Sequence, residues 1–268
     1  MELDVLEKEI SKHKLFDGNM LDIINAVADS IPSNTLPYRS KLLIAVSELI
    51  LYASQFHRHI KLWNDSIIPI NAISFLIAKS GIAKDSSLRA ARKCFQASYD
   101  IIEEARREMT VTKDKETVLN ENPNLKPENV TFTLYKDFYV KPSPLFVAVS
   151  TAEGFTQHLS EMNKEPLGSG FIYSGEVGQE LLTNPNMSDM IKIISETDDE
   201  GNKEAKMLKN KENQTEELKS VAVSALFMGS QDNIIYNEEI KKRFKMEFNT
   251  KLARRSFINF VYENLDPN

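Results

Sequence analysis

Hydrophobic residues recur at helical spacing through the first part of the chain. Apolar side chains between residues 16 and 31 fall on one stripe, at intervals of three and four residues. A strongly apolar segment, Leu42 to Tyr52, continues the helical pattern. Pro32 and Pro37 bracket the link between the two segments, because proline tends to end the element before it. We therefore predict a helical N-terminal region over residues 1–65.

From residue 66 the pattern is that of an α/β domain. A β-rich apolar run, IIPINAISFLI, leads through a short loop into a long segment of helical periodicity, Ser86 to Met109. Strands and helices then alternate, which favours crossover units on a mainly parallel sheet. The further predicted strands are Pro144–Ser150, Gly170–Ser174 and Val221–Gly229, and the further helices are Ala152–Met162, Glu176–Leu182, Asn237–Phe248 and Thr250–Asn264.

Two polar stretches interrupt this second region. Residues 111–128 are poor in apolar periodicity and contain two prolines, and residues 197–217 are highly charged. Both are interpreted as polar excursions from one α/β domain that covers residues 66–268.

Composition narrows the class of protein. The formal net charge is −6 and the pI is near 5.4, so contact with nucleic acid has to come from a local basic patch. Cys94 is the one cysteine, which excludes an intrachain disulfide. No apolar stretch is long enough to cross a membrane, and the charged N-terminus lacks the core of a signal peptide. We expect a cytoplasmic protein, in the host cytoplasm if it is viral, without a membrane partner.

The loop AKSGIAKD, residues 78–85, is the strongest candidate for chemistry. A phosphate-binding loop needs converging backbone amides, small residues where the chain turns sharply and a lysine for the β and γ phosphates. Lys84 stands where that lysine belongs, between an apolar strand and a helix. The predicted nucleotide-binding residues of this loop are Ser80, Gly81, Ile82, Ala83, Lys84 and Asp85.

The loop departs from the phosphate-binding pattern in three places. Both framing glycines are alanines, Ala78 and Ala83, and Asp85 replaces the Ser or Thr that would hold magnesium. A residue with a Cβ at position 83 is costly if φ there is positive. An ordinary strand-to-helix turn is therefore an alternative interpretation. In the nucleotide-binding interpretation, Asp85 helps to place Mg²⁺.

Later segments resemble the remaining parts of P-loop ATPases. The strand FIYSGE resembles the strand that ends in an Asp-Glu pair, with Glu176 in the place of the water-activating glutamate and Gly175 in the place of the magnesium aspartate. A third apolar strand ends at Ser230, where such enzymes often place a residue that senses the γ-phosphate. Near the C-terminus, Arg254 and Arg255 could reach a phosphate from the same or a neighbouring subunit.

These segments occur in an order that is similar to the ATPase-like domain of phage and plasmid replication proteins of the primase-helicase type. The segments are IAKSGIAKDSS, STAEGFTQHLSEM, GSGFIYSGEVGQELL, SALFMGSQD and ARRSFINFV, and the resemblance covers residues 67–262. It implies a RecA-like P-loop sheet flanked by helices, ATP and Mg²⁺ as ligands, helicase-like ATP hydrolysis and a setting in DNA replication. A homo-oligomer is a further expectation.

A second hypothesis keeps the fold without the nucleotide site. In it, the chain is a non-enzymatic subunit that binds single-stranded DNA, another nucleic acid, or a replication or transcription protein such as a polymerase. Basic residues near the C-terminus would make the nucleic-acid contact. The alternative is that such a charge run only forms the solvent-exposed face of a helix. These residues are Lys241, Lys242, Arg243, Lys245 and Lys251.

Overall fold

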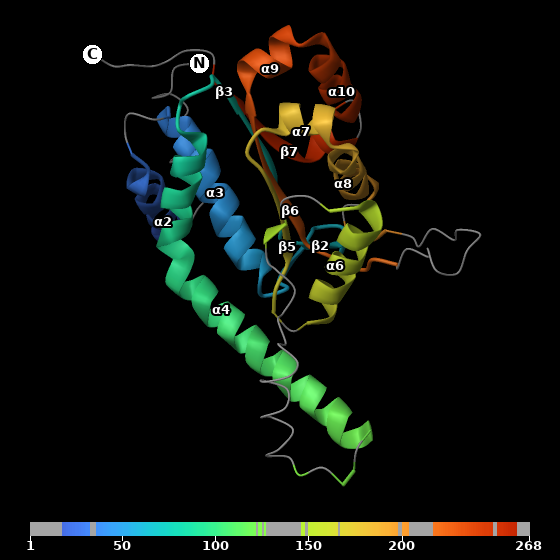
Figure 1. The fold of residues 1–268 in the computed structure, drawn as a ribbon. Helices are drawn as coiled ribbons and strands as arrows, with labels where there is room; N and C mark the ends of the chain where they lie inside the picture. Colours follow the sequence, from blue (N-terminus) through green and yellow to red (C-terminus); the bar gives the residue numbers. More distant parts are fainter. Residues whose placement is uncertain are drawn as a thin grey trace, which may run out of the picture.

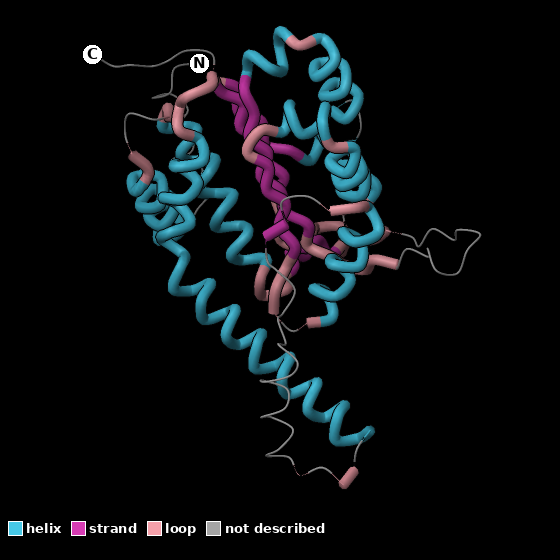
Figure 2. Tube along the Cα trace, viewed as in Figure 1, coloured by secondary structure: helices cyan, strands magenta, loops and turns pink. Residues whose placement is uncertain are grey.

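The computed structural model shows a parallel sheet with helices on both faces and a separate two-stranded hairpin (Figures 1 and 2). This confirms the predicted α/β class with a helical N-terminal region, and the arrangement is compatible with a RecA-like α/β fold. The residues described are 18–32, 36–121, 123–124, 126, 146–147, 150–165, 167–197, 200–203, 217–248 and 251–261.

The sheet has five strands in the order β4-β5-β6-β3-β7, and every neighbouring pair is parallel. All positions of the two central strands, β3 and β6, are buried, as expected for parallel strands covered on both faces. The Phe75 and Phe227 rings stack across these strands with centroids 4.9 Å apart. The strands are β4 (Phe146–Val147), β5 (Gly170–Ser174), β6 (Val223–Ser230), β3 (Ile73–Ala78) and β7 (Ser256–Phe260).

One face of the sheet is covered by α2 (Gly18–Ser30), α3 (Tyr38–Ser54) and α4 (Lys84–Glu121) (Figure 1). Their buried residues form one hydrophobic cluster with Leu76 and Ala78 of β3. The predicted N-terminal helices are therefore packed directly on the sheet.

An ion pair is buried within this helical layer. Arg92 of α4 donates to Glu48 of α3 over 3.1 Å, and burial raises the pKa of Glu48 to about 7 although Arg92 opposes the rise. The Arg92 guanidinium also lies 4.3 Å from the centre of the Phe146 ring. Arg92 thus joins both helices to the short edge strand β4.

The opposite face is covered by the helices that follow β4, β5 and β6 (Figure 1). Residues of β3 alternate between the faces, so that Phe75 and Ile77 belong to this second cluster. The covering helices are α6 (Ala152–Lys164), α7 (Val177–Thr183), α8 (Pro185–Glu196), α9 (Gln231–Tyr236) and α10 (Glu238–Phe248).

The C-terminal segment differs from its prediction. Residues predicted as a helix from Thr250 to Asn264 form instead a 3-10 turn, η2 (Lys251–Arg255), and strand β7 (Ser256–Phe260). The sequence SFINF suits a strand, because aromatic and β-branched side chains fit a pleated surface. Pairing with the central strand β3 makes the segment a strand, and local periodicity could not predict this pairing because β3 is far away in the sequence.

Two further boundaries also differ. Helix α4 continues through Val111 to Glu121, into the stretch predicted as a polar excursion, because no glycine or proline interrupts it before Pro123. The run IIPINAISFLI supplies β3 and also β2 (Ile67–Pro69), which pairs antiparallel with β1 (His59–Lys61) in the hairpin. Among the described residues, no helix is long and apolar enough to cross a membrane.

Candidate functional site

The chain reverses its winding at the centre of the sheet. After β3 it passes to α4 on one face, and after the neighbouring strand β6 it passes to α9 and α10 on the other face (Figure 1). In open α/β sheets, ligands bind in the crevice outside the carboxyl ends of the strands at such a switch point. The topology alone therefore selects the end of β3, and with it the loop of residues 79–83, as the place to look for a site.

The loop turns through two residues with positive φ. Gly81 has φ +85° and Ala83 has φ +49°, so the position aligned with a framing glycine does require the left-handed region. The sequence-based concern about an alanine at position 83 is confirmed. A side chain with a Cβ costs roughly 1–2 kcal/mol in this conformation. The loop therefore has the backbone path of a tight turn that glycine would suit better.

Lys84 begins α4 and points back over the loop. The residue as a whole is 9% exposed, and its ammonium group donates to the carbonyl of Ala78, at the end of β3, over 3.5 Å. Burial lowers the pKa of Lys84, and the carboxylates of Glu176, Asp85 and Asp232 oppose this shift. One partly desolvated cation thus lies among three acidic groups that come from different elements.

Glu176 and Ser230 are brought together at the ends of β5 and β6. The backbone N–H of Ser230 donates to Glu176 Oε1 over 2.7 Å, and the Asn233 amide lies 3.4 Å from the same oxygen. Ser230 is buried and Glu176 is half-buried. These contacts fix the glutamate between the two strand ends, where its charge acts on Lys84.

Asp85 lies beside the end of β5. Its side chain is exposed, and its Oδ1 accepts a hydrogen bond from the hydroxyl of Tyr173. Burial raises the pKa of Tyr173, and the hydrogen bond to Asp85 raises it further. The phenol therefore stays protonated at neutral pH and holds the carboxylate in place.

The predicted arginines lie at the other end of the sheet. Arg255 precedes β7, whose first residue pairs with Ile73 at the start of β3, about 16 Å along the strand from the loop. Its guanidinium donates to the carbonyl of Thr197. The side chain of Arg254 is outside the described set. Within one chain, the structure does not bring Arg255 to Lys84.

Arg39 lies at the correct end of the sheet and was missed. It is in the first turn of α3 and donates to the carbonyl of Phe260, at the carboxyl end of β7, over 3.2 Å. Phe260 pairs with Ile77, one residue before the end of β3. The sequence carried no signal for Arg39, because it lies far upstream of the loop and only the β3–β7 pairing brings it near.

Three further polar residues at the ends of β5 and β6 were not predicted: Tyr173, Asp232 and Asn233. Each lies within three residues of a strand end, on β5 or in the first turn of α9. Polar residues at the carboxyl ends of parallel strands are a usable sequence signal. This signal could not select these residues from the sequence, because the order of the strands in the sheet decides which strand ends lie together.

The predicted nucleic-acid contacts are on α10 and just after it. Lys241, Lys242 and Lys245 are exposed, and Lys241 pairs with Glu238 over 3.1 Å. Arg243 instead donates to the carbonyl of Leu181 over 2.8 Å and so ties α10 to α7. Lys251 begins η2, and its side chain is outside the described set.

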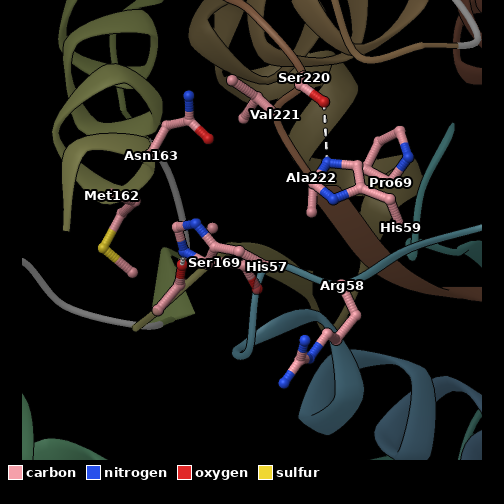
Figure 3. A pocket seen from close by; sticks show the side chains of 12 residues that line it. His57, Arg58, His59, Pro69, Met162, Asn163, Ser169, Ser220, Val221 and Ala222 are labelled. Atoms are coloured by element: carbon pink, nitrogen blue, oxygen red, sulfur yellow. Dashed lines mark hydrogen bonds between the residues drawn. The ribbon is translucent and has the colours of Figure 1, made fainter. Parts of the chain in front are cut away.

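A pocket lies at the amino ends of β5 and β6, opposite the loop (Figure 3). Its polar side chains are used to attach the hairpin. His59 contacts the Ser220 hydroxyl over 2.8 Å, and His57 contacts the Gly168 carbonyl. These two contacts use the pocket's histidines to anchor the hairpin.

No group of three or more His, Cys, Asp or Glu side chains that could hold a metal ion occurs in the described part of the chain. A comparison of the sequence with protein-family models gives no match, and a search of curated proteins finds none with significant similarity. The candidate site is therefore defined by its geometry.

Strain at Ala83 gives a first testable prediction. Replacement by glycine removes the Cβ at φ +49° and should raise the free energy of unfolding by about 1 kcal/mol, or Tm by about 2–4 °C. Thermal unfolding measures this. Ala90→Gly in the second turn of α4 is the matched control and should lower Tm by a similar amount. A loss of stability in both variants would contradict the assigned loop conformation.

Proposed function

We propose that this chain binds a nucleoside triphosphate together with Mg²⁺ at the switch point, as a diverged P-loop domain of a phage-type DNA replication protein. The observation that carries the proposal is the position of Lys84. It is a buried cation on a tight strand-to-helix loop, with the ends of β5 and β6 contributing Glu176 and Ser230 beside it. The replication setting is supported by the order of sequence segments described above.

In this proposal the loop and the start of α4 hold the phosphates. The first N–H groups of a helix have no partner within the helix, and the helix dipole favours an anion at that end. Lys84 is in the first turn of α4 and adds a full positive charge whose hydration is already reduced by burial. The β and γ phosphates would lie over residues 80–85 and replace the weak 3.5 Å contact of Lys84 with Ala78.

The charge balance of the crevice explains why Mg²⁺ would be needed. Lys84 faces the three carboxylates of Glu176, Asp85 and Asp232, which leaves a formal excess of negative charge. A triphosphate alone would be repelled by these groups. Mg²⁺ is usually held by one or two carboxylates and by substrate phosphates, so the exposed Asp85 carboxylate fits that role. When bound, the ion would neutralise charge on the phosphate oxygens.

Glu176 is the candidate group for hydrolysis. The Ser230 N–H and the Asn233 amide hold one of its oxygens, which fixes the carboxylate at the crevice. A carboxylate held in this way can accept a proton from an attacking water if its other oxygen faces that water. Arg39 donates to the carbonyl of Phe260 at the carboxyl end of β7, beside β3, and so lies at the same end of the sheet as the loop.

Removal of the Lys84 ammonium tests the binding site. A ligand that binds the folded state raises Tm, so we expect Mg²⁺ and ATP at millimolar concentration to stabilise the natural protein. Lys84→Ala should abolish that rise. Lys79→Ala is the matched control, because Lys79 is an exposed lysine of the same loop, and it should retain most of the rise. Equal rises in all three proteins would exclude the loop as the phosphate site.

The exposed lysines of α10 support a second, compatible function, which is binding of single-stranded nucleic acid. Lys242 and Lys245 are three residues apart, so they project from the same side of the helix. Backbone phosphates are bound mainly through such cations, and that binding weakens steeply with salt. Because α10 packs on α7, which begins next to Glu176, a strand bound there would be close to the candidate nucleotide site.

Charge reversal on α10 tests this contact. Lys242→Glu with Lys245→Glu should weaken binding of an unstructured oligonucleotide and lower the salt dependence of its affinity. The control is Lys61→Glu with Lys93→Glu, which changes the net charge equally on β1 and α4. Equal weakening by both pairs would show only a general charge effect, and no binding by the natural protein would exclude the function.

A further inference from the structure

Positions 85 and 175 carry the reverse of the P-loop pattern. In that pattern, a hydroxyl residue follows the loop lysine and a carboxylate ends the acidic strand. Here the loop lysine is followed by Asp85, and the end of β5 carries Gly175. Taken alone, each departure is the loss of a magnesium ligand. In the folded chain the two positions are neighbours, so the carboxylate gained at Asp85 can replace the one that is lacking at Gly175.

The Asp85 carboxylate occupies the space that a side chain at position 175 would need. A Cβ built on Gly175 would lie 3.2 Å from Asp85 Oδ1 and 3.3 Å from the Tyr173 hydroxyl. The φ of Gly175 is not in the left-handed region, so its backbone does not require glycine. The lack of a side chain at position 175 therefore leaves room for the carboxylate of Asp85.

Tyr173 holds the carboxylate in that position. It comes from β5, two residues before Gly175, and its hydroxyl donates to Asp85 Oδ1. The Arg92 guanidinium lies 5.2 Å from the centre of the Tyr173 ring and restricts its movement on the side of α4. The second Asp85 oxygen is left for a ligand, since the side chain as a whole is exposed.

We infer that the magnesium-facing carboxylate of this protein has moved from the end of β5 to the start of α4, so that Asp85 takes the role left open by Gly175 and Tyr173 positions it. This inference rests on the proposed function and adds to it how the Asp85 carboxylate is held in place, by the Tyr173 hydroxyl and by the space left open at Gly175. The site thus keeps one carboxylate for the ion, supplied from the opposite side of the crevice.

The shared space can be tested without any ligand, by a cycle of four proteins: the natural chain, Gly175→Asp, Asp85→Ser, and the double variant. Gly175→Asp alone places a second carboxylate against Asp85 and should lower Tm by about 3 °C or more. The double variant should recover most of this loss, because the two carboxylates are then reduced to one. Additive changes in Tm would show that the two side chains do not share a space and would overturn the inference.

A neutral variant separates crowding from charge. Gly175→Asn has the same shape as Gly175→Asp, so its Tm should lie between those of the natural protein and Gly175→Asp. A Tm as low as that of Gly175→Asp would assign the whole effect to crowding, which supports the shared space but not the charge repulsion. Recovery in the Asp85→Ser double variant still decides between the shared space and independence.

The role toward magnesium is tested by measuring ATP affinity with Mg²⁺ and with a chelator. The natural protein should bind more tightly with Mg²⁺. Asp85→Ser should lose roughly tenfold or more of that gain while its affinity in chelator is kept or improved, and the double variant should regain most of the gain. Tyr173→Phe should lose part of the increase in ATP affinity that Mg²⁺ gives. If Asp85 acted without the Tyr173 hydrogen bond, this variant would keep the whole increase.

The outcomes distinguish the two proposals. If the natural protein binds ATP in neither condition, the proposed function fails. If it binds with a Mg²⁺ gain that Asp85→Ser leaves intact, only the exchange of carboxylates is overturned. A gain that is lost in Asp85→Ser and restored in the double variant supports both.

Discussion

Parallel pairing of β3 between β6 and β7 is the constraint on which the rest of the molecule depends. Every residue of β3 is buried, so helices must cover both faces, and the chain leaves β3 and β6 toward opposite sides. In open α/β sheets, such a divergence marks the carboxyl ends of the strands as the expected place for a ligand. The loop, Lys84 and the acidic groups around it acquire a common location only through this pairing.

The carboxyl ends of the central strands combine an arrangement suited to an anion with a local excess of negative charge. The start of α4 and Lys84 favour phosphate, whereas Glu176, Asp85 and Asp232 oppose it. These tendencies are reconciled if the ligand is itself a complex of phosphate and a divalent cation. A loop with alanines in place of its framing glycines could still hold a nucleotide in this way. The phosphates would be held by the charges of Lys84 and the cation as well as by the shape of the loop backbone.

The sequence predicted what depends on local patterning and missed what depends on strand order. Strand β5 and the α/β class followed from apolar periodicity, and the strain at Ala83 followed from the loop pattern. Strand β7 was predicted as a helix because its pairing with β3 is a long-range contact. For the same reason Arg255 was assigned to the site although it lies at the opposite end of the sheet, whereas Arg39 lies at the loop end. The contact of Asp85 with Tyr173 likewise required three dimensions.

Hydrogen exchange of the backbone amides, with and without Mg²⁺ and ATP, is the most direct test that the nucleotide binds at the switch point. Bound phosphate would engage the N–H groups at the start of α4, so exchange should slow in residues 79–87, with a smaller effect in residues 230–233 after β6. Slowing confined to the hairpin and the pocket of His57 and Ser220, or no slowing in residues 79–87, would contradict the account.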